Sequence, residues 1–384
     1  MKTEDYIKSL EDLDFKKSTL SSRRIIIAGG GTGGHIFPAI AIANALIKQQ
    51  PGTEILFVGA LGKMEMKKVP EAGFNIVGLY IAGYNRSSFM KNITLPFKLA
   101  KSFYQVTQIL RSFRPDAIIG VGGYSSFPVV RLAQTRQIPT FIHESNSLPG
   151  RSNKLLARRA KRVFVSSESM NQYFLNDNLV VTGNPVRSSI YHSEIIRSEA
   201  MEYFGLKLEL KTVLVVGGSL GAKSINEAIN ANISAFKQNN LQLIWQTGKS
   251  FADDAAHVEE ENPNTWTRAF IDKMEYAYAA ADIVVSRAGA MTVSELCIVG
   301  KPVIFIPYPY ASEDHQTANA MALVKKKAAL VVKDSEVQTK LINLIIDLVN
   351  DTELMKELRG NIKKEGKTNA DDLIASEILK VIND

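Results

Sequence analysis

Cysteine is almost missing from this sequence, since Cys297 is the only one in 384 residues. A lone cysteine excludes an internal disulfide, and no Cys or His pair has metal-ligand spacing, which argues against a structural zinc site. Long apolar runs are missing too, because Lys, Arg, Asn or Gly interrupts every candidate before the roughly 20 residues needed to cross a bilayer. We therefore expect a soluble or peripheral protein.

A secretory signal is also lacking at the start of the chain. Residues 1–23 are polar, carry charges of both signs and contain no apolar segment of the kind that a signal peptide needs. We interpret them as a polar N-terminal extension, and we expect a cytoplasmic location.

No long block of like charge occurs in the chain. The net charge of +7 is spread out, with local basic clusters at Lys67-Lys68, Arg158-Arg159, Lys161-Arg162 and Lys325–Lys327. Such clusters suit phosphates or an anionic membrane surface, although each one alone is more typical of a solvated helix face. No nucleic acid partner is expected.

Short β-rich runs alternate with longer helical patterns along the whole chain, which is typical of parallel sheets covered by helices. The first series of expected strands is Arg24–Ala28, Glu54–Val58, Ala117–Val121, Thr140–His143 and Val163–Val165. The second series is Thr212–Val216, Leu241–Trp245, Asp282–Ser286, Val303–Ile306 and Ala329–Val332. We predict an α/β fold with two Rossmann-like, doubly wound parallel-sheet domains.

The boundary between the two domains is expected at Gly183-Asn184-Pro185-Val186, where Gly and Pro end the last strand of the first half. The predicted domains are residues 24–186 and residues 187–368, followed by a helical segment at 369–384. Ligands of such sheets bind beyond the carboxyl ends of the strands, so we expect the two domains to face a central cleft.

A glycine-rich segment, Gly29–Gly34, follows the first strand and precedes a helix whose first turn we expect to include Pro38. Exposed amides and the positive end of the helix dipole favour a phosphate or diphosphate there. The segment also fits the dinucleotide fingerprint of a dehydrogenase, which expects an acidic residue at the end of the next strand. That strand ends in Gly59 and Ala60, with Glu54 at the wrong end, so the dehydrogenase interpretation is weak.

Three further glycine turns follow expected strands, at Gly122–Ser126, Gly217–Gly221 and Gly289–Thr292. One such turn is weak evidence, because tight packing of helix on strand alone selects glycine. Four at equivalent strand ends favour a long ligand with more than one phosphorylated part, such as a nucleotide sugar together with a pyrophosphoryl lipid.

Several polar side chains lie next to these turns. His35 could take a proton from an attacking hydroxyl, or it could simply cap its helix. Glu295 could accept hydrogen bonds from both ribose hydroxyls of a nucleotide, but Thr292 and Glu295 also fit a capping box, which needs no ligand. The amides of Asn146 and Gln316 each follow a strand and could read sugar hydroxyls.

The only Asp-x-Asp, the arrangement by which many sugar transferases hold a divalent metal, is Asp12-Leu13-Asp14. It precedes the first strand, so we expect no metal and no cofactor. Helix dipoles and basic side chains such as Arg187 would then neutralise a departing diphosphate.

Aromatic and basic residues mix between Tyr84 and Phe113. The part before Leu99, which includes Pro96, fits a lipid-facing loop in a membrane interface. The part after Leu99 is more typical of an amphipathic helix packed on the sheet.

Together these motifs resemble the MurG-type transferases of peptidoglycan assembly, which form lipid II. The match runs from about Arg24 to the C-terminus and rests on seven segments in the family's order: GGGTGGHIFPAIAIA, VGGYSSFP, HESNSLPG, GNPVR, GGSLGA, RAGAMTVSEL and EDHQTANA. The resemblance implies a GT-B fold and inverting, metal-independent transfer of N-acetylglucosamine from UDP. The acceptor would be the MurNAc C4 hydroxyl of undecaprenyl-pyrophosphoryl-MurNAc-pentapeptide, which is lipid I.

The resemblance also implies roles for particular residues. Thr32, Gly33 and Gly34 would approach the donor and the acceptor pyrophosphate, Asn146 the donor sugar, Gln316 the sugar hydroxyls and Ile271 the uracil. The diphosphate and ribose would be held by Arg187, Ser219, Ala290, Met291, Thr292, Val293, Ser294 and Glu295. The N-terminal domain would bind the acceptor and the membrane, the C-terminal domain would bind UDP-GlcNAc, and the last helix would cross back onto the first domain.

The resemblance further suggests a peripheral position at the cytoplasmic face of the bacterial inner membrane, in a cell-wall synthesis complex. One departure is Ser145, which stands where family members carry Gln, so a sugar contact is lost or passes through water. His35 is the candidate base, with Glu144 as the alternative. Competing functions are a UDP-N-acetylglucosamine 2-epimerase, a non-catalytic scaffold, and a lipid glycosyltransferase that uses UDP-galactose and diacylglycerol.

Overall fold

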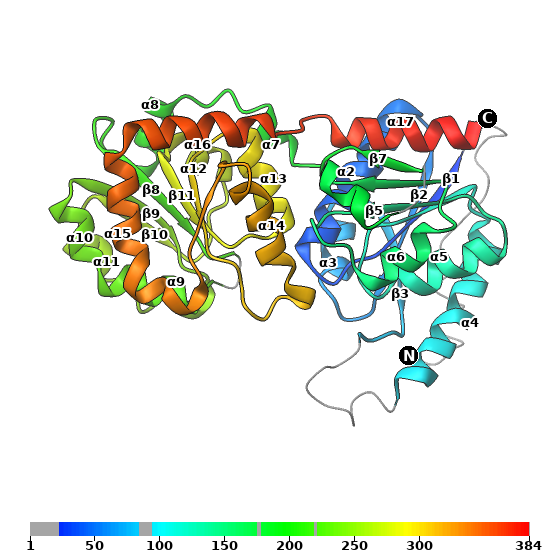
Figure 1. The fold of residues 1–384 in the computed structure, drawn as a ribbon. Helices are drawn as coiled ribbons and strands as arrows, with labels where there is room; N and C mark the ends of the chain where they lie inside the picture. Colours follow the sequence, from blue (N-terminus) through cyan, green and yellow to red (C-terminus); the bar gives the residue numbers. More distant parts are fainter. Residues whose placement is uncertain (1–22, 84–93, 175–177, 219–220, 384) are drawn as a thin grey trace. The chain divides into compact units, whose positions relative to one another are not determined.

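The computed structural model describes residues 23–83, 94–174, 178–218 and 221–383. The chain divides into two units: the first is Met1–Pro185 with Asn369–Asp384, and the second is Val186–Thr368 (Figure 1). The structure thus divides the chain one residue before the position that the sequence suggested.

In the described part of unit 1, seven parallel strands form one sheet in the order β3-β2-β1-β4-β5-β6-β7. The strand order reverses between β1 and β4, so the ends of these two strands form the switch point where open α/β sheets bind ligands. The strands are β1 (Arg24–Ala28), β2 (Glu54–Ala60), β3 (Asn75–Leu79), β4 (Ala117–Gly120), β5 (Thr140–Glu144), β6 (Arg162–Val165) and β7 (Leu179–Val181).

Both faces of this sheet are covered, because successive residues of a strand point to opposite sides. Ile26 belongs to one apolar cluster, and its neighbours Ile25 and Ile27 belong to another. The helices of unit 1 are α2 (Gly33–Gln49), α3 (Glu65–Glu71), α4 (Leu95–Phe113), α5 (Ser126–Thr135), α6 (Arg151–Ala157) and α17 (Ala370–Asn383), with a 3₁₀ turn η2 (Glu168–Gln172).

Helix α17, drawn in red in Figure 1, is the end of the chain and packs on α2 in unit 1. Its side chains Ile374, Ala375, Ile378 and Leu379 are buried in the same cluster as Ile25 and Ile27. At the edge of this contact, Lys48 of α2 lies 3.2 Å from the Asp372 carboxylate. The C-terminal segment is therefore part of the core of unit 1.

Unit 2 repeats this arrangement. In its described part, six parallel strands lie in the order β10-β9-β8-β11-β12-β13, with the switch point between β8 and β11. The strands are β8 (Lys211–Val216), β9 (Leu241–Gln246), β10 (Thr265–Arg268), β11 (Ile283–Ser286), β12 (Val303–Phe305) and β13 (Leu330–Val331).

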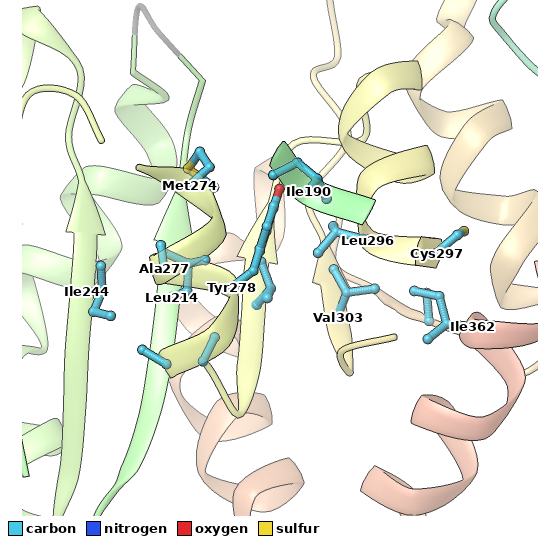
Figure 2. Close-up of a cluster of buried hydrophobic side chains, with 14 of the residues drawn as sticks. Ile190, Leu214, Ile244, Met274, Ala277, Tyr278, Leu296, Cys297, Val303 and Ile362 are labelled. Atoms are coloured by element: carbon cyan, nitrogen blue, oxygen red, sulfur yellow. The ribbon is translucent and has the colours of Figure 1, made fainter. Parts of the chain in front are cut away.

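Two apolar clusters again cover opposite faces of this sheet, with Leu214 in one and its neighbours Val213 and Val215 in the other. The cluster that contains Leu214 is shown in Figure 2. The helices of unit 2 are α7 (Ser188–Tyr191), α8 (Arg197–Phe204), α9 (Lys223–Ala231), α10 (Ile233–Gln238), α11 (Val258–Glu261), α12 (Met274–Ala280), α13 (Ala290–Val299), α14 (His315–Val324), α15 (Val337–Asn350) and α16 (Thr352–Lys364).

The predicted fold class, two doubly wound parallel-sheet domains, is confirmed. Two local expectations were wrong. Helix α2 begins at Gly33, so Pro38 lies in its second turn and not in its first. The residues from Leu95 to Leu99 are helical and do not form a loop. Pro96 lies near the start of α4, where a missing N–H costs nothing, so it does not interrupt the helix. Residues 84–93 of the aromatic stretch lie outside the described residues.

Candidate active site

Two glycine turns of unit 1 meet at the switch point of its sheet. The Gly30 N–H donates to the Gly122 carbonyl at 3.3 Å. A Cβ on Gly123 would collide with the Gly30 carbonyl oxygen, and Gly123 has φ +81°. The close approach of the two backbones therefore requires glycine at this position.

Glu65 fixes the position of the first glycine loop through hydrogen bonds. This carboxylate, at the start of α3, is 1% exposed and accepts hydrogen bonds from the Gly31 N–H and the Ala60 N–H, both at 2.9 Å. A Cβ on Gly30 would overlap the Glu65 carboxyl group. The amides of Gly30 and Gly31 are thus both already used within the protein.

The amides of Thr32, Gly33 and Gly34 are in a different position. They lie at the N-terminal end of α2, where the first N–H groups of a helix have no acceptor within the helix. Because the helix dipole also favours negative charge there, these three groups can bind an anion. They are the loop residues that the sequence indicated.

His35 lies in the first turn of α2, beside the second glycine turn. Its Nδ1 is 3.1 Å from the Gly30 carbonyl oxygen and 3.3 Å from the Thr32 hydroxyl. A carbonyl can only accept, so Nδ1 carries the proton and the lone pair of the neutral ring is on Nε2. The ring lies against Gly122: a Cβ added to Gly122 would lie 2.7 Å from both Cδ2 and Nε2 of His35. This imidazole therefore braces the loop and has the tautomer of a general base.

His143, on β5, is completely buried. Its Nδ1 lies 3.5 Å from the Ser145 hydroxyl. Burial, and then the neighbouring His35, lowers the pKa of His143 to about 4. His143 is therefore neutral at physiological pH and serves as a polar part of the core rather than as a second acid.

This shift predicts a pH-dependent contribution of His143 to stability. An unfolded histidine binds its proton near pH 6.5, whereas the folded one stays neutral until about pH 4, so the folded state loses stability as the pH falls between these values. The expected loss approaches about 3 kcal/mol. In urea unfolding, the free energy of wild type minus that of His143→Gln should decrease by this amount from pH 7 to pH 4. The exposed His257→Gln should show no comparable trend, and a constant difference for His143→Gln would contradict the assignment.

Glu144, the alternative base, has both carboxylate oxygens occupied. Oε1 accepts from the Asn146 N–H at 3.0 Å and from the Asn146 side-chain amide at 3.2 Å. Oε2 accepts from the Gly150 N–H at 3.1 Å and the Asn153 amide at 2.8 Å. Glu144 is 3% exposed, so its four donors leave it the role of a buried acceptor that orients Asn146.

Ser145 follows Glu144 and contacts the glycine loop. Pro38 has no N–H, so the Gly34 carbonyl lacks its usual donor in α2. The Ser145 hydroxyl donates to this carbonyl at 3.5 Å. The serine therefore has a local role in the loop, independent of any sugar.

In unit 2 the structure brings together Arg187 and Glu295, both indicated by the sequence. Nε and Nη2 of Arg187 lie 3.2 and 2.9 Å from Oε1 of Glu295. Oε2 accepts from the Tyr278 hydroxyl at 3.0 Å. Burial and the adjacent carboxylate raise the pKa of Tyr278 well above its usual value, so its hydroxyl remains a donor.

The capping-box interpretation of Thr292 and Glu295 is wrong. The N-cap of α13 is Gly289, which places Thr292 inside the helix and Glu295 in its second turn. Ala290, Met291 and Thr292 form the first turn of α13, where the backbone N–H groups have no acceptor within the helix. The Val293 N–H already donates to the Gly289 carbonyl at 2.9 Å, so Val293 and Ser294 follow inside the helix. Glu295 does not cap its own helix, and its partners are Arg187 and Tyr278.

Ile271 follows β10 and is almost fully buried. Its N–H donates to Oε1 of Gln246 at 3.0 Å, and Nε2 of Gln246 donates to the Gly218 carbonyl at 3.0 Å. Gln246 thus connects the Ile271 loop to the glycine turn that follows β8. Ser219, the other residue predicted in that turn, lies outside the described residues.

Gln316 lies in the first turn of α14. Its Oε1 accepts from the Tyr308 N–H at 2.9 Å, which fixes the orientation of the side-chain amide. The NH₂ group is then the part of Gln316 that can donate to a sugar hydroxyl.

Three contributors to these sites were not foreseen from the sequence: Glu65, Gln246 and Tyr278. Each lies in a segment with an ordinary helix or strand pattern, and none belongs to a motif whose spacing indicates a functional residue. Within residues 23–83, 94–174, 178–218 and 221–383, no group of three or more His, Cys, Asp or Glu side chains could hold a metal ion. The Asp12 and Asp14 pair lies outside this part of the chain.

The fold and these sites define a class of protein. Two doubly wound sheets, each with glycine turns and a helix N-terminus at its switch point, are the architecture of GT-B glycosyltransferases. The N-terminal domain model of glycosyltransferase family 28 matches residues 25–165, and its C-terminal domain model matches residues 212–374. The chain belongs to glycosyltransferase family 28.

Relatives of known name share most of the length of this chain. A protein of Bacteroides thetaiotaomicron is 46% identical over 362 residues, which are 93% of this chain and 97% of the relative. One of Porphyromonas gingivalis is 45% identical over 94% of this chain and 96% of its own length. Both are named UDP-N-acetylglucosamine--N-acetylmuramyl-(pentapeptide) pyrophosphoryl-undecaprenol N-acetylglucosamine transferase. The resemblance to the MurG-type transferases is therefore confirmed.

Solved structures agree on the fold. MurG of Acinetobacter baumannii superposes with a TM-score of 0.74 at 28% identity, covering 93% of this chain and 99% of its own. The UDP-GlcNAc 2-epimerase of Neisseria meningitidis reaches 0.64 at 16% identity, covering 93% of this chain and 100% of its own. At 16% identity, the likeness to the epimerase shows a shared fold alone. None of the described helices is both long and apolar enough to span a membrane.

Proposed function

We propose that the chain transfers N-acetylglucosamine from UDP-N-acetylglucosamine to the MurNAc C4 hydroxyl of undecaprenyl-pyrophosphoryl-MurNAc-pentapeptide, which converts lipid I to lipid II in peptidoglycan biosynthesis. The observation that carries this proposal is the 46% identity, over 93% of the chain, to a transferase named for that reaction. The enzyme is a UDP-GlcNAc-dependent hexosyltransferase.

Unit 2, residues 187–368 in the sequence-based division, is the donor domain in this proposal. Ile271 reads the uracil through its backbone, and Glu295 accepts hydrogen bonds from the ribose hydroxyls. Arg187, Ser219 and the amides at the start of α13 receive the diphosphate. Gln316 donates its NH₂ group to the sugar. The support is that Ile271 and the start of α13 follow strands of the unit 2 sheet at its carboxyl edge, the ligand-binding edge of such folds.

Unit 1, residues 24–186 with 369–384, is the acceptor domain. Thr32, Gly33 and Gly34 direct their amides toward a pyrophosphate. Asn146, held by Glu144, reaches the donor sugar. This assignment gives the nucleotide to unit 2 and the attacking hydroxyl to unit 1, so transfer requires both units.

The reaction is a single displacement. Nε2 of His35 takes the proton of the C4 hydroxyl as its oxygen attacks the anomeric carbon, and the bond from that carbon to the UDP oxygen breaks with inversion. Arg187 and the positive end of α13 stabilise the charge that develops on UDP, so the proposal needs no metal. His35 is favoured over Glu144 because all four hydrogen bonds of Glu144 come from within the protein.

A Glu144→Gln variant tests this distinction. Glutamine has a single acceptor oxygen, so its NH₂ group would face donors and the Asn146 segment would shift, at a cost of about 2 kcal/mol. We expect the KM for UDP-GlcNAc to rise while the acidic limb of the pH–rate profile keeps its position. The exposed Glu260→Gln should have no effect. Loss of the acidic limb in Glu144→Gln would identify Glu144 as the base instead.

An anionic membrane surface is the proposed location, at the cytoplasmic face of the inner membrane, because the acceptor carries a lipid. Helix α4 buries Val106, Ile109 and Leu110 on the sheet and leaves Phe97 79% exposed. Lys98 and Lys101 lie on the same helix. An apolar side chain flanked by cations suits an interface with anionic lipid. Membership of a cell-wall synthesis complex remains part of the proposal.

The test of the whole proposal is transfer itself. Radiolabelled UDP-GlcNAc is incubated with a lipid I analogue in detergent, and labelled disaccharide lipid is the expected product. An epimerase would change the donor at C2 without acceptor, and a UDP-galactose:diacylglycerol enzyme would label diacylglycerol from UDP-galactose. A scaffold would bind UDP weakly or not at all. Absence of transfer to the lipid I analogue under every detergent condition would refute the proposal.

A further inference from the structure

Glu295 is a carboxylate in a nearly closed environment. It is 8% exposed and lies in the second turn of α13, with Leu296 and Cys297 buried beside it in the chain. Oε1 is paired with the Arg187 guanidinium, whose side chain is 43% exposed, and Oε2 is bound to the Tyr278 hydroxyl. The two oxygens therefore have partners of different character, one exposed and one fixed in the core.

Tyr278 is the fixed partner. It lies on α12, is 3% exposed, and belongs to the apolar cluster that includes Ile190 and Leu296. Figure 2 shows its ring among these side chains, with the hydroxyl oxygen at the end of the ring away from α12. Because the ring is enclosed on its sides, the position of the hydroxyl is set by core packing.

Nε and Nη2 of Arg187 both point at Oε1 of Glu295, and a diphosphate would compete for these donors. In the proposed complex its guanidinium turns toward the diphosphate, and Oε1 of Glu295 becomes the acceptor for the ribose hydroxyls. Oε2 then still needs a donor from within the protein to fix the orientation of the carboxylate, since a buried charged oxygen without a hydrogen bond is strongly disfavoured. Tyr278 is placed to be that donor.

We propose that Tyr278 is a positioning residue that holds Glu295 in the orientation that accepts the ribose hydroxyls of the nucleotide. The inference rests on the proposed function of Glu295 and adds a residue of the protein core to the specificity for a ribonucleotide. Tyr278 itself does not touch the substrate.

The test compares UDP with 2′,3′-dideoxy-UDP, which lacks both ribose hydroxyls, by calorimetric titration of the full chain. Wild type should bind UDP more tightly than the dideoxy analogue. In Tyr278→Phe the affinity for UDP should fall by roughly tenfold, the effect of losing one hydrogen bond to a charged group. Binding of the dideoxy analogue should change little, so the preference for the ribose shrinks. In turnover, the KM for the donor should rise while kcat stays close to wild type.

The matched control is Tyr276→Phe, on the same helix. The Tyr276 ring packs near the Tyr203 ring, with 4.8 Å between centroids, and is not part of the Glu295 network. This variant should keep the wild-type preference for UDP. Thermal unfolding of both variants checks that the core of unit 2 is intact, and Tyr278→Leu offers a second variant without the hydroxyl.

Two outcomes separate the possible errors. If wild type binds UDP and the dideoxy analogue equally, Glu295 does not read the ribose, and the proposed function of that residue fails together with this inference. If wild type prefers UDP and Tyr278→Phe keeps the whole preference, or loses affinity equally for both ligands, the role of Tyr278 alone is refuted.

Discussion

Replacement of His35 by alanine is expected to lower kcat by roughly 10²- to 10⁴-fold, the usual contribution of a general base. The affinity for UDP-GlcNAc should remain near that of wild type, because the nucleotide is assigned to unit 2, whereas the affinity for the lipid I analogue falls modestly as the glycine loop loses its contact with the imidazole. Steady-state turnover and separate binding titrations of both substrates measure the two effects.

The control for this variant is His257→Ala, an exposed histidine at the start of α11 in unit 2. It should have wild-type turnover. His35→Gln separates the two functions of the imidazole, since an amide can still donate to the Gly30 carbonyl but is not a base at neutral pH. Near-normal turnover of His35→Ala, with normal binding of both substrates, would remove His35 from the mechanism.

Ile378→Asp is expected to unfold unit 1 while leaving unit 2 folded. Ile378 of α17 is completely buried in the cluster formed with β1 and α2. Loss of its packing costs about 2–5 kcal/mol, and burial of an unpaired carboxylate adds to that. A sum of this size consumes most of the roughly 5–15 kcal/mol that stabilise a domain. Calorimetry should show one transition moved to much lower temperature and one unchanged.

The comparison for this prediction is Lys380→Asp, which also introduces a carboxylate on α17 but at an exposed position. Its two transitions should remain near those of wild type. UDP binding, assigned to unit 2, should survive in Ile378→Asp although transfer is lost. If both transitions moved together, the last helix would not belong to the core of unit 1 alone.

Much of the fold follows from alternation of β-rich and helical segments. The inner strands were predicted from the sequence to within one or two residues at most ends, because a strand buried on both faces is a nearly continuous apolar run. The strands β3, β7 and β10 were not among the ten that the sequence indicated by range, and each lies at an edge of its sheet. The strand β7 has only three residues and β10 reads Thr-Trp-Thr-Arg, so neither forms the longer apolar run that marks a buried strand.

The positions of the binding turns were also predictable, because glycine at a strand end has a backbone reason to be there. The side chains behind these turns were not. Glu65, Gln246 and Tyr278 act through partners that lie 34, 28 and 17 residues away in the chain, and no local spacing connects such pairs. Even the Thr292 and Glu295 spacing misled, because the N-cap of the helix is Gly289 and not Thr292.

The sequence by itself determined the fold class, the glycine turns, the order of the motifs and, through them, the family. Only the tertiary structure decided how each polar group is used: Glu144 is bound by four internal donors, His35 has the tautomer of a base, and Glu295 has Tyr278 behind it. The reason is physical. Hydrophobic periodicity is a property of neighbouring residues, whereas the protonation and orientation of a buried polar side chain depend on atoms brought to it by other strands and helices.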